Sequence, residues 1–441
     1  MKRYVAIAAT VTVFAVFAVV AAVLALPVSA AEYVGSETCG SCHTDKAKDW
    51  LGTWHSQHIG DPKEPGTIFG NFATNEYFSI EDVAYGVGNE RKQYYITKKG
   101  DDYLFLPAYW DGEARKWVKS ENPRKWNEYC AKCHTAGYDA KTKTWAELNI
   151  TCETCHGPGS EHVEGGGDKS KIQKSYGSEA CGTCHGQIDL WKDTGHAKAL
   201  KTLQGRSSAT ARCYECHSAD YRLAPEDAKP ALKDLKAPLT CAACHDPHSA
   251  ANEAQLRTSV EKACVTCHNG ELEDKSAFEA GKAVHHPQEE VFEGKGAIGV
   301  PSMPSLKTAE CVDCHMAGGN HSFKPGTPEV TYLSKGKNVT VNACAKCHSG
   351  LTKERVAAAQ KAIVGRIGSL KTRLDAVKAG IAAKKEKGQD VAGIQNLYNE
   401  AFTNVSLVES DGSKGIHNPR YLQASLGAAE SRLTQAEELL K

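Results

Sequence analysis

Residues 152–163 read CETCHGPGSEHV, a stretch that places two cysteines, two histidines and a Gly-Pro-Gly turn side by side. The unit Cys-x-x-Cys-His inside it recurs at nine places along the chain. Together the nine copies use all 18 cysteines, and a histidine follows the second cysteine every time. A repeat this regular decides which kind of fold the chain can form.

The repeated unit gives two sets of residues that share one chemistry. The cysteine pairs are Cys39 and Cys42, Cys130 and Cys133, Cys152 and Cys155, Cys181 and Cys184, Cys213 and Cys216, Cys241 and Cys244, Cys264 and Cys267, Cys311 and Cys314, and Cys344 and Cys347. The histidines that close the nine motifs are His43, His134, His156, His185, His217, His245, His268, His315 and His348.

Three chemistries compete for such a motif. Disulfides would account for an even number of cysteines, but not for the fixed spacing or the histidine. Structural zinc needs four ligands and therefore paired motifs, and nine motifs cannot all pair. Covalent c-type haem accounts for every feature, because two thioether bonds fix the porphyrin and the next residue supplies an axial imidazole. The sequence therefore predicts nine covalently bound haem c groups.

The N-terminus and the charge balance indicate where such a chain works. Lys2 and Arg3 precede an apolar run over residues 5–26, and Val28-Ser29-Ala30 offers a cleavage site, which is typical of a signal peptide over residues 1–30. The apolar run is also long enough to span a bilayer, so a retained anchor remains an alternative. We expect an exported protein of the periplasm, cell wall or cell surface. The 53 basic and 53 acidic residues cancel, which gives no nucleic-acid footprint.

The number of haems predicts the fold class. Without residues 1–30 the chain has about 46 residues per motif, too few to give each porphyrin a protein core of its own. We therefore expect a mainly α, haem-packed multihaem cytochrome. Residues 94–106 and 109–118 alternate around turn residues, which predicts a small excursion of β-hairpins. Residues 351–441 lack cysteine, and apolar residues recur every three or four positions over 356–381 and 422–440, which predicts a C-terminal region of long helices.

A haem iron takes a second axial ligand, which the motif does not supply. The nine remaining histidines are His55, His58, His162, His196, His248, His285, His286, His321 and His417. His55 and His58 lie one helical turn apart and His285 and His286 are adjacent, so each pair would have to serve two different irons. If one member of each pair is not a ligand, one or two irons stay open and can bind a small molecule, while the others relay electrons.

The first part of the chain resembles tetrahaem cytochromes that serve hydroxylamine oxidation. The resemblance rests on Tyr33-Val34-Gly35-Ser36, on Trp50 five residues before His55, and on CETCHGPGSEHV. It implies a tetrahaem cytochrome-like domain over residues 31–190. It also implies that His162 and His55 are distal ligands.

The second part resembles the pentahaem ammonia-forming nitrite reductases and their octahaem relatives. The matching segments are Gly195-His196-Ala197, CAACHDPHS over residues 241–249, CVDCHM with Asn320-His321, and Gly415-Ile416-His417. The resemblance implies a pentahaem domain over residues 191–350, with His196, His248, His321 and His417 as distal ligands. It also implies a homodimer formed through the helices of residues 351–441.

The chain departs from that family where the chemistry would occur. The family attaches its catalytic haem through a motif that ends in lysine, whereas the matching motif here ends in His217, and 264-CVTCHNGELE-273 lacks the family's active-site tyrosine. Arg206 and His286, with His285 beside it, match the family's remaining active-site groups around the haem on Cys213 and Cys216. Two plainer roles compete: Arg206 pairing with a haem propionate, and His285 or His286 acting as an iron ligand.

As a whole, the chain resembles the nine-haem cell-wall cytochromes of extracellular electron transfer. This resemblance predicts that the chain is a terminal reductase, which transfers electrons from an upstream cytochrome or quinol-linked donor to metal oxides, electrodes or soluble shuttles. Two alternatives remain: a nitrite or hydroxylamine reductase acting at an open haem, and a storage or wiring protein without an open iron.

Overall fold

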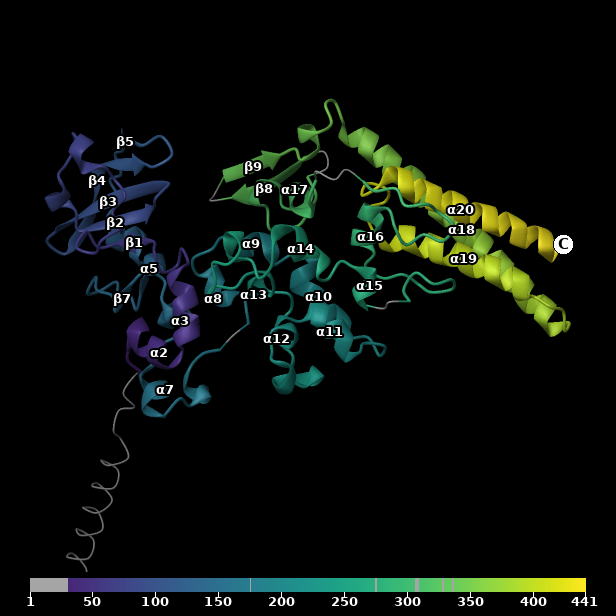
Figure 1. The fold of residues 1–441 in the computed structure, drawn as a ribbon, viewed down its shortest axis with the longest axis horizontal. Coiled ribbons are helices and arrows are strands. Elements are labelled where there is room, and N and C mark those ends of the chain that lie inside the picture. The colour runs from purple at the N-terminus through teal and green to yellow at the C-terminus, as the bar shows by residue number, and fades with distance from the viewer. Residues whose placement is uncertain (1–30, 175, 274–275, 306–308, 327–328, 335–336) are drawn as a thin grey trace, which may run out of the picture. The chain divides into compact units, whose positions relative to one another are not determined.

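The computed structural model describes residues 31–174, 176–273, 276–305, 309–326, 329–334 and 337–441 (Figure 1). The predicted signal peptide over residues 1–30 lies outside these residues. The chain divides into two compact units, which are described separately. The first comprises residues 31–44 and 58–174, and the second comprises 45–57 and 176–441. The fourth motif, at Cys181, thus falls in the second unit, whereas the sequence-based division assigns it to the tetrahaem-like domain.

The first unit contains a five-stranded antiparallel sheet in the order β1-β2-β3-β4-β5. The strands are β1 (Ile59–Gly60), β2 (Tyr85–Asn89), β3 (Lys92–Lys99), β4 (Asp102–Asp111) and β5 (Lys116–Lys119). Gly100 has a φ of 61° in the turn between β3 and β4, a conformation that glycine adopts without strain. Both β-hairpins expected from the alternating sequence are therefore present.

The sheet has an apolar cluster on each face, because neighbouring residues of a strand point to opposite sides. On one face Ile96 and Tyr103 pack with Trp126, which is fully buried. On the other face Tyr95 and Trp110 pack beneath the loop that precedes β2. The sheet and the side chains on its two faces thus form a small hydrophobic core that consists of apolar side chains.

The helices of the first unit are short, and several carry the motifs. They are α2 (Ser36–Cys42), α4 (Trp126–Tyr129), α5 (Ala131–His134), α6 (Cys152–His156) and α7 (Ser160–Glu164), with 3₁₀ turns at Phe72–Thr74, Ile80–Asp82 and Lys169–Lys171. A second small sheet pairs β6 (Thr135–Ala136) with β7 (Glu147–Leu148).

The motif-bearing part of the second unit is also built from short helices joined by irregular segments. Its helices are α3 (Thr44–Leu51, which begins at the last residue of the first unit), α8 (Glu179–Gly182), α9 (Ile188–Trp191), α10 (Gly195–Gln204), α11 (Ala211–His217), α12 (Ala219–Arg222), α13 (Cys241–Cys244), α14 (Val260–Val265), α15 (Gly270–Glu273), α16 (Gln288–Glu293) and α17 (Cys311–His315). Its 3₁₀ turns are Glu226–Ala228, Leu232–Asp234, Glu253–Gln255, Ala317–Gly319 and Cys344–Lys346. A hairpin of β8 (Val330–Ser334) and β9 (Lys337–Val341), which the sequence reading did not predict, lies between the eighth and ninth motifs.

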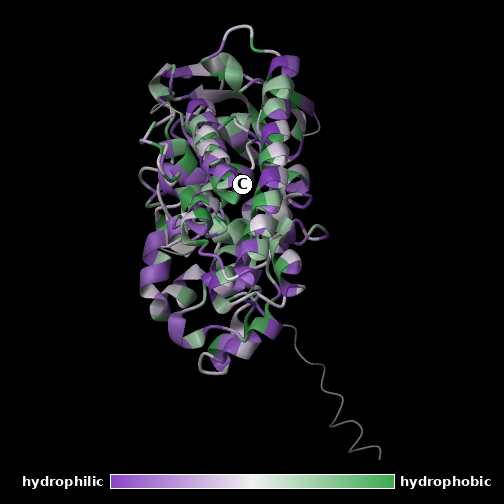
Figure 2. Ribbon diagram, turned by 90° about the vertical axis from the view of Figure 1, so that its right-hand side faces the viewer, coloured by the Kyte–Doolittle hydropathy of each residue, from purple (hydrophilic) through white to green (hydrophobic). Residues whose placement is uncertain are grey.

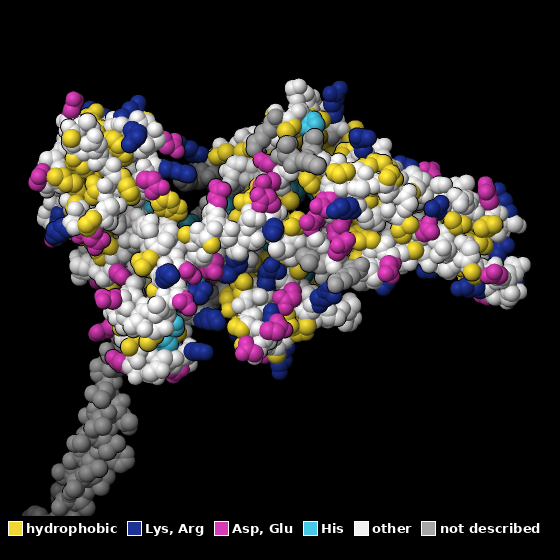
Figure 3. Space-filling model, in the orientation of Figure 1, with side chains coloured by type: hydrophobic (Ala, Val, Ile, Leu, Met, Phe, Trp, Pro, Cys, Tyr) yellow, Lys and Arg dark blue, Asp and Glu magenta, His cyan; other side chains and the backbone are white. Residues whose placement is uncertain are grey.

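Three long helices end the chain and lie side by side in Figure 1: α18 (Lys353–Glu386), α19 (Ala392–Ser410) and α20 (Pro419–Leu440). The apolar residues predicted over 356–381 are all buried, and those from Ile363 to Ile381 belong to the core that these helices share. Figure 2, which looks onto the end of the molecule that carries the C-terminus, shows helices with both hydrophobic and hydrophilic residues on their surfaces. In Figure 3 basic and acidic side chains are interspersed over their surface, where Arg373 pairs with Glu437 at 2.8 Å. The expected C-terminal region of long helices is therefore present.

Within the residues that the structure describes, no helix is both long and apolar enough to cross a membrane.

Candidate functional site: the motif helices and their histidines

The motifs fit covalent haem because most of them form a single helical turn. On α6, for example, Cys152 and Cys155 are three residues apart and His156 follows at the next position. Residues three and four apart lie on the same face of a helix, so both sulfur atoms and the imidazole point to one side. The residues present therefore match the three attachment points of a c-type haem.

Motifs far apart in the sequence lie next to one another. In the first unit the side chain of Cys39 contacts that of Cys152. In the second unit the corresponding contacts are Cys181 with Cys241, Cys216 with Cys267, and Cys264 with Cys311. Cys244 also lies near Cys267, and Cys314 lies near Cys344. Within the second unit these contacts connect all the motifs from the fourth to the ninth, and the seventh motif lies next to the fifth, the sixth and the eighth.

Five motif histidines face a second histidine at a nearly constant distance. The separations between ring centroids are 6.3 Å for His43 and His162, 6.2 Å for His55 and His185, 6.1 Å for His196 and His268, 6.3 Å for His245 and His321, and 6.1 Å for His315 and His417.

This distance has a chemical meaning. An imidazole nitrogen binds a first-row metal ion at about 2 Å, so two imidazoles on opposite sides of one ion have centroids about 6–6.5 Å apart. The five pairs therefore have the separation that two axial ligands of one iron require. They include His55, His162, His196, His321 and His417, five of the histidines that the sequence nominated as distal ligands.

The fifth and seventh motifs form a cluster instead of separate pairs. The ring centroid of His286 lies 5.9 Å from that of His217 and 6.1 Å from that of His268. The ring centroid of His196 also lies 6.1 Å from that of His268. His268 thus has two neighbours at a distance suited to an axial ligand, and His217 has one. The backbone of His286 has a φ of 49°, an uncommon conformation for a residue other than glycine.

The second motif has a different geometry. His58 stacks on His134 with the ring centroids 4.3 Å apart and the planes at 23°. Two imidazoles at this distance leave no space for an iron between them. The other motif histidines with a ring contact among the described residues have separations of 5.9 Å or more.

Hydrogen bonds at Nδ1 orient many of the rings so that Nε2 faces outward. Nδ1 donates to a backbone carbonyl in His156 (Gln173, 2.7 Å), His162 (Asp168, 2.9 Å), His245 (Ala254, 2.8 Å), His315 (Phe323, 3.0 Å) and His321 (Gly319, 3.0 Å). A histidine that ligates a metal through one nitrogen usually donates from the other, which fixes its tautomer and orientation.

Two histidines use a carboxylate for the same purpose. Nδ1 of His417 lies 2.6 Å from Oδ1 of Asp411, and Nδ1 of His248 lies 3.0 Å from Oδ1 of Asp246. Asp246 also pairs with Arg257 at 3.2 Å. A carboxylate partner makes an imidazole more electron-rich than a carbonyl partner does, so these two rings differ in donor strength from the others.

His134 and His217 lack this support. The Nδ1 atoms of both rings are buried and have no hydrogen-bond partner among the described residues. These are the histidines of the second and fifth motifs, which also have the unusual ring geometries. A buried Nδ1 atom without a partner and an unusual ring contact thus distinguish the second and fifth motifs from the others.

Burial shifts the pKa values of the histidines away from the charged form. It lowers the pKa of His268 to about 4 and also lowers the pKa values of His134 and His196. At His417 burial acts in the same direction, but the hydrogen bond and charge of Asp411 outweigh it, so its pKa is raised. Neutral imidazole is the form that binds a metal, so the buried rings are already in the form that iron needs.

The residues nominated for catalysis are only partly brought together. His286 lies in the cluster, whereas His285 is exposed and has its ring 6.5 Å from that of His286. Arg206 is exposed at the end of α10, and its side chain forms no hydrogen bond or ion pair with the described residues. Asp246 and Asp411 were not singled out by the sequence; the signal available for Asp246 was its position directly after the sixth motif.

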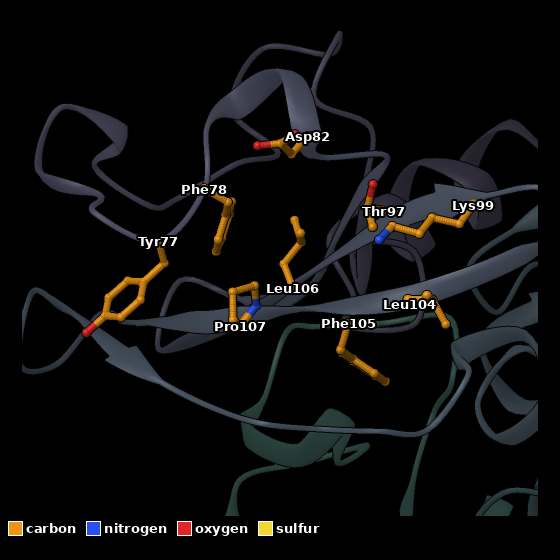
Figure 4. Close-up of a pocket in the computed structure, with 9 residues that line it drawn as sticks. All are labelled: Tyr77, Phe78, Asp82, Thr97, Lys99, Leu104, Phe105, Leu106 and Pro107. Atoms are coloured by element: carbon orange, nitrogen blue, oxygen red, sulfur yellow. The ribbon is translucent and has the colours of Figure 1, made fainter.

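A shallow cavity of about 350 Å³ lies elsewhere in the first unit, on the sheet. Figure 4 shows Tyr77, Phe78 and Asp82 on the loop that faces the strands carrying Thr97 and residues 104–107. No motif cysteine or candidate axial histidine lines it. The cavity is therefore separate from the candidate redox centres.

Three family models match the chain. The model of cytochrome c554 and c-prime matches residues 89–157, that of cytochrome c7 and related cytochromes matches residues 193–269, and that of outer membrane cytochrome MtrC/MtrF-like domains II/IV matches residues 236–380. Multihaem cytochrome MtrA of Shewanella baltica (strain OS185) is 26% identical over 238 residues, which cover 45% of this chain. The match spans 66% of the length of MtrA.

Two solved structures are similar over most of the chain. The undecahaem cytochrome from the S-layer of Carboxydothermus ferrireducens is 28% identical with a TM-score of 0.74, and the match covers 95% of this chain and 72% of that one. The outer cell wall cytochrome OcwA is 31% identical with a TM-score of 0.73, and the match covers 91% of this chain and 99% of OcwA. The chain therefore belongs to the multihaem c-type cytochromes of extracellular electron transfer, the family that includes OcwA.

Proposed function

We propose that this protein binds nine c-type haems through its nine motifs and acts outside the cytoplasm as a terminal reductase. It would accept electrons from an upstream cytochrome or quinol-linked donor and deliver them to metal oxides, electrodes or soluble shuttles. The observation that carries this proposal is the network of contacts between motifs within each unit. When bound, c-type haem supplies an iron that takes up and gives up one electron at a time.

The chain's own residues have two tasks in this function. The paired histidines, such as His43 with His162 and His315 with His417, would hold a haem iron between them and keep small molecules away from it. The motif contacts, such as Cys216 with Cys267 and Cys264 with Cys311, keep neighbouring centres close. Both support a relay, because an iron with two axial histidines mainly transfers electrons.

The location follows from the sequence and the relatives. The relatives named for an outer cell wall and an S-layer are extracytoplasmic. We propose that residues 1–30 direct export and are either cleaved or retained as an anchor. Mass spectrometry of the N-terminus of the exported protein distinguishes these outcomes.

The test uses the full chain matured in a host that attaches c-type haem. We expect nine irons per chain, the absorption bands of thioether-linked haem, and rapid reoxidation of the reduced protein by ferric oxide particles and by a soluble quinone. A ratio well below nine would contradict the proposed number of haems. A reduced protein that neither acceptor reoxidises would contradict the terminal reductase.

A second candidate function, reduction of nitrite or hydroxylamine, is favoured by the fifth motif alone. His217 has no Nδ1 partner among the described residues, and its one ring neighbour, His286, is also a neighbour of His268. If His286 does not bind iron there, it can protonate a bound nitrogen oxide, because imidazole exchanges protons near neutral pH. Arg206 and His285 would supply positive charge and a further proton donor.

Turnover with a reduced dye tests this candidate. We expect Arg206→Ala and His286→Ala to lower nitrite or hydroxylamine reduction at least tenfold while reoxidation by ferric oxide stays unchanged. Lys201→Ala, an exposed change on α10, is the control. Wild-type rates no higher than those of a cytochrome whose irons all have two axial histidines, or an EPR spectrum without any high-spin signal, would instead support the wiring protein.

We also propose a homodimer. The predicted apolar positions of α18 pack within the chain, so a subunit contact would need the opposite face, where Ala358, Ala362, Gly365, Ser369 and Ala376 are exposed. Cβ atoms added at Gly365 and Gly368 would meet nothing within 4 Å, so a second helix can approach closely there. Light scattering should give twice the mass of the chain, and Gly365→Arg should give the monomer.

A further inference from the structure

Glu153, the residue between the first cysteine of the third motif and Thr154, has its carboxylate buried among backbone amides. Its side chain is 3% exposed. Oε1 accepts hydrogen bonds from the amides of Val34 at 2.9 Å and Gly159 at 2.8 Å, and Oε2 accepts one from Gly35 at 2.8 Å. The Val34 amide also lies 3.1 Å from Oε2. One side chain thus joins two segments, at residues 34–35 and at residue 159, that are over 100 residues apart in the sequence.

The hydrogen bonds indicate that this carboxylate carries its charge. Every partner is an N–H donor, and both oxygens accept. A protonated carboxyl would have to donate one hydrogen bond, whereas an ionised one only accepts. Among the described residues no lysine or arginine pairs with Glu153, so the charge is balanced by amide dipoles rather than by a cation.

The first link fixes the element that carries the first motif. Gly35, with a φ of 84°, directly precedes α2, and its carbonyl accepts the amide of Cys39 at 3.3 Å. The helix then continues to His43, whose amide donates to the Cys39 carbonyl at 2.9 Å. The contact between Glu153 and Gly35 therefore sets the position of the helix that ends at the motif histidine.

The second link fixes the element that carries the opposite histidine. Gly159 caps α7, and its carbonyl accepts the amide of Val163 at 3.0 Å, next to His162. A Cβ atom on Gly159 would lie 3.1 Å from Val34 and 3.3 Å from Oε1 of Glu153, so a glycine suits this approach. Glu32 and Ser160 join the same two segments directly, at 2.8 and 3.1 Å.

We propose that Glu153 is a positioning residue for both axial histidines of the first haem, His43 and His162, and that its buried negative charge lowers the reduction potentials of the first and third haems. The inference rests on the proposal that these two histidines share one iron.

The charge is close enough to matter to both centres. Glu153 acts electrostatically on Cys39, which in turn contacts Cys152, the residue before Glu153. A negative charge in a poorly hydrated site stabilises the oxidised, more positive state of a nearby iron, and the interaction is weakly screened there. The third motif thereby influences the first through one side chain. This role accounts for the compact sequence CETCHGPGSEH, because Glu153, Gly159 and His162 all belong to one arrangement.

The experiment compares full-length, haem-loaded variants by potentiometric titration followed by EPR. Glu153→Gln removes the charge and keeps the size. We expect the low-spin signal of the His43–His162 pair to titrate at a higher potential than in the wild type, with nine haems still attached. Glu161→Gln, on α7 with its half-buried carboxylate 3.4 Å from Lys171, is the matched control and should shift that potential much less than Glu153→Gln does. An unchanged potential in Glu153→Gln would refute the electrostatic role.

Two further variants separate the charge from the anchoring. Glu147 accepts from the Ser36 amide at 3.1 Å and its hydroxyl at 2.9 Å, so it anchors the same segment from a half-buried position. Glu147→Gln removes a carboxylate that also acts electrostatically on Cys39, but from a less buried position, so it should shift the potential less than Glu153→Gln. An equal shift would mean that the deep burial of Glu153 adds nothing to its effect. Glu153→Asp keeps the charge but shortens the reach, and should broaden or weaken the low-spin signal. If Glu153→Gln does not assemble, an unaltered signal in Glu153→Asp would refute the positioning role.

A last variant tests the underlying ligand assignment independently. His162→Ala should abolish one low-spin signal and create a high-spin one, which also identifies the signal that the other variants shift. If His162→Ala leaves every signal intact, the ligand proposal fails, whatever the Glu153 variants do.

Discussion

The C-terminal helices and the motif-bearing segments of the second unit bury their side chains in opposite ways. In α18, α19 and α20 apolar residues form a continuous core, with Leu426 and Leu433 fully buried. In the motif-bearing segments the apolar cluster is small, centred on Leu200 and Tyr214, and the facing side chains are histidines about 6 Å apart. The first region is stabilised by the hydrophobic effect. The second has few apolar contacts, and its side chains are arranged around the positions where haem would bind.

This difference teaches which parts of the chain depend on haem attachment. A helix bundle with a continuous apolar core gains its stability when its side chains leave water. Short helices with few buried apolar contacts do not gain enough to offset the entropy of ordering the chain. We therefore expect the two regions to respond differently when haem is withheld.

The largest expected effect comes from producing the chain without haem attachment. Proteolysis should digest the segments over residues 176–273 and leave fragments over about 276–305 and 353–440, because Val284 and Val291 are buried in the same core as the bundle. Mass spectrometry of the surviving fragments measures this. The haem-loaded protein, digested in parallel, should resist cleavage in both regions. Equal cleavage of both regions in the haem-free chain would contradict the claim that only the bundle is stable without haem.

The next effect concerns the bundle itself. Leu433→Ala removes a fully buried side chain and should lower the free energy of unfolding of the bundle by about 2–5 kcal/mol. Leu439→Ala, on the same helix but 55% exposed, should change it by less than about 0.5 kcal/mol. Chemical denaturation followed by far-UV circular dichroism compares them. Equal effects would mean that the apolar core does not hold this region.

The sequence predicted the local features well, for a physical reason. The alternation at residues 94–106 and the three- to four-residue rhythm from Val356 to Ile381 depend on backbone periodicity, which neighbours in the sequence set. The motif turns are local too, because one helical turn brings Cys152, Cys155 and His156 to one side. Such features need no knowledge of distant segments.

Features that depend on distant segments were harder to predict. Helix α19 buries Thr403 and Asn404, which interrupt its apolar pattern. Their partners lie far away: Asn404 bonds both the amide and the carbonyl of Ile298, at 2.7 and 2.9 Å. The choice between His196 and His286 as neighbour of His268 is of the same kind. The sequence nominated both histidines but held no information on which segment folds beside α14.

A smaller effect is expected where the helix bundle contacts a candidate iron ligand, at Asp411 and His417. Asp411 follows α19, is 2% exposed, and lies 2.6 Å from Nδ1 of His417. Asp411→Asn should raise the reduction potential of the haem on Cys311 and Cys314, because a neutral partner makes the imidazole a weaker donor to oxidised iron. Glu409→Gln, an exposed change at the end of the same helix, is the control. A potential that stays the same in a potentiometric titration would show that the carboxylate only orients the ring.

The smallest effect tests the contact between the five-stranded sheet and α4, the helix that leads into the second motif. Asp102 on β4 accepts from Lys125 at 2.9 Å and from Lys143 at 2.6 Å, and Lys125 caps α4, which leads into the second motif. Hydrogen bonds from these two lysines lower the pKa of Asp102 below its ordinary value of 3.8. A carboxyl with a lowered pKa in the folded state stabilises that state above its ordinary pKa, and the contribution is lost as the pH falls through the folded value.

Asp102→Asn should therefore destabilise the sheet slightly at neutral pH and make no difference at a pH below the lowered pKa. Chemical denaturation followed by far-UV circular dichroism at each pH measures this difference. The wild type and the variant should differ at pH 6 and converge as the pH falls below 3.8. Convergence in acid is what a charge interaction requires, since both side chains are then neutral. A difference that persists unchanged would mean that shape rather than charge joins α4 to the sheet, and the second motif would then depend on the sheet core in the way that the bundle depends on its own.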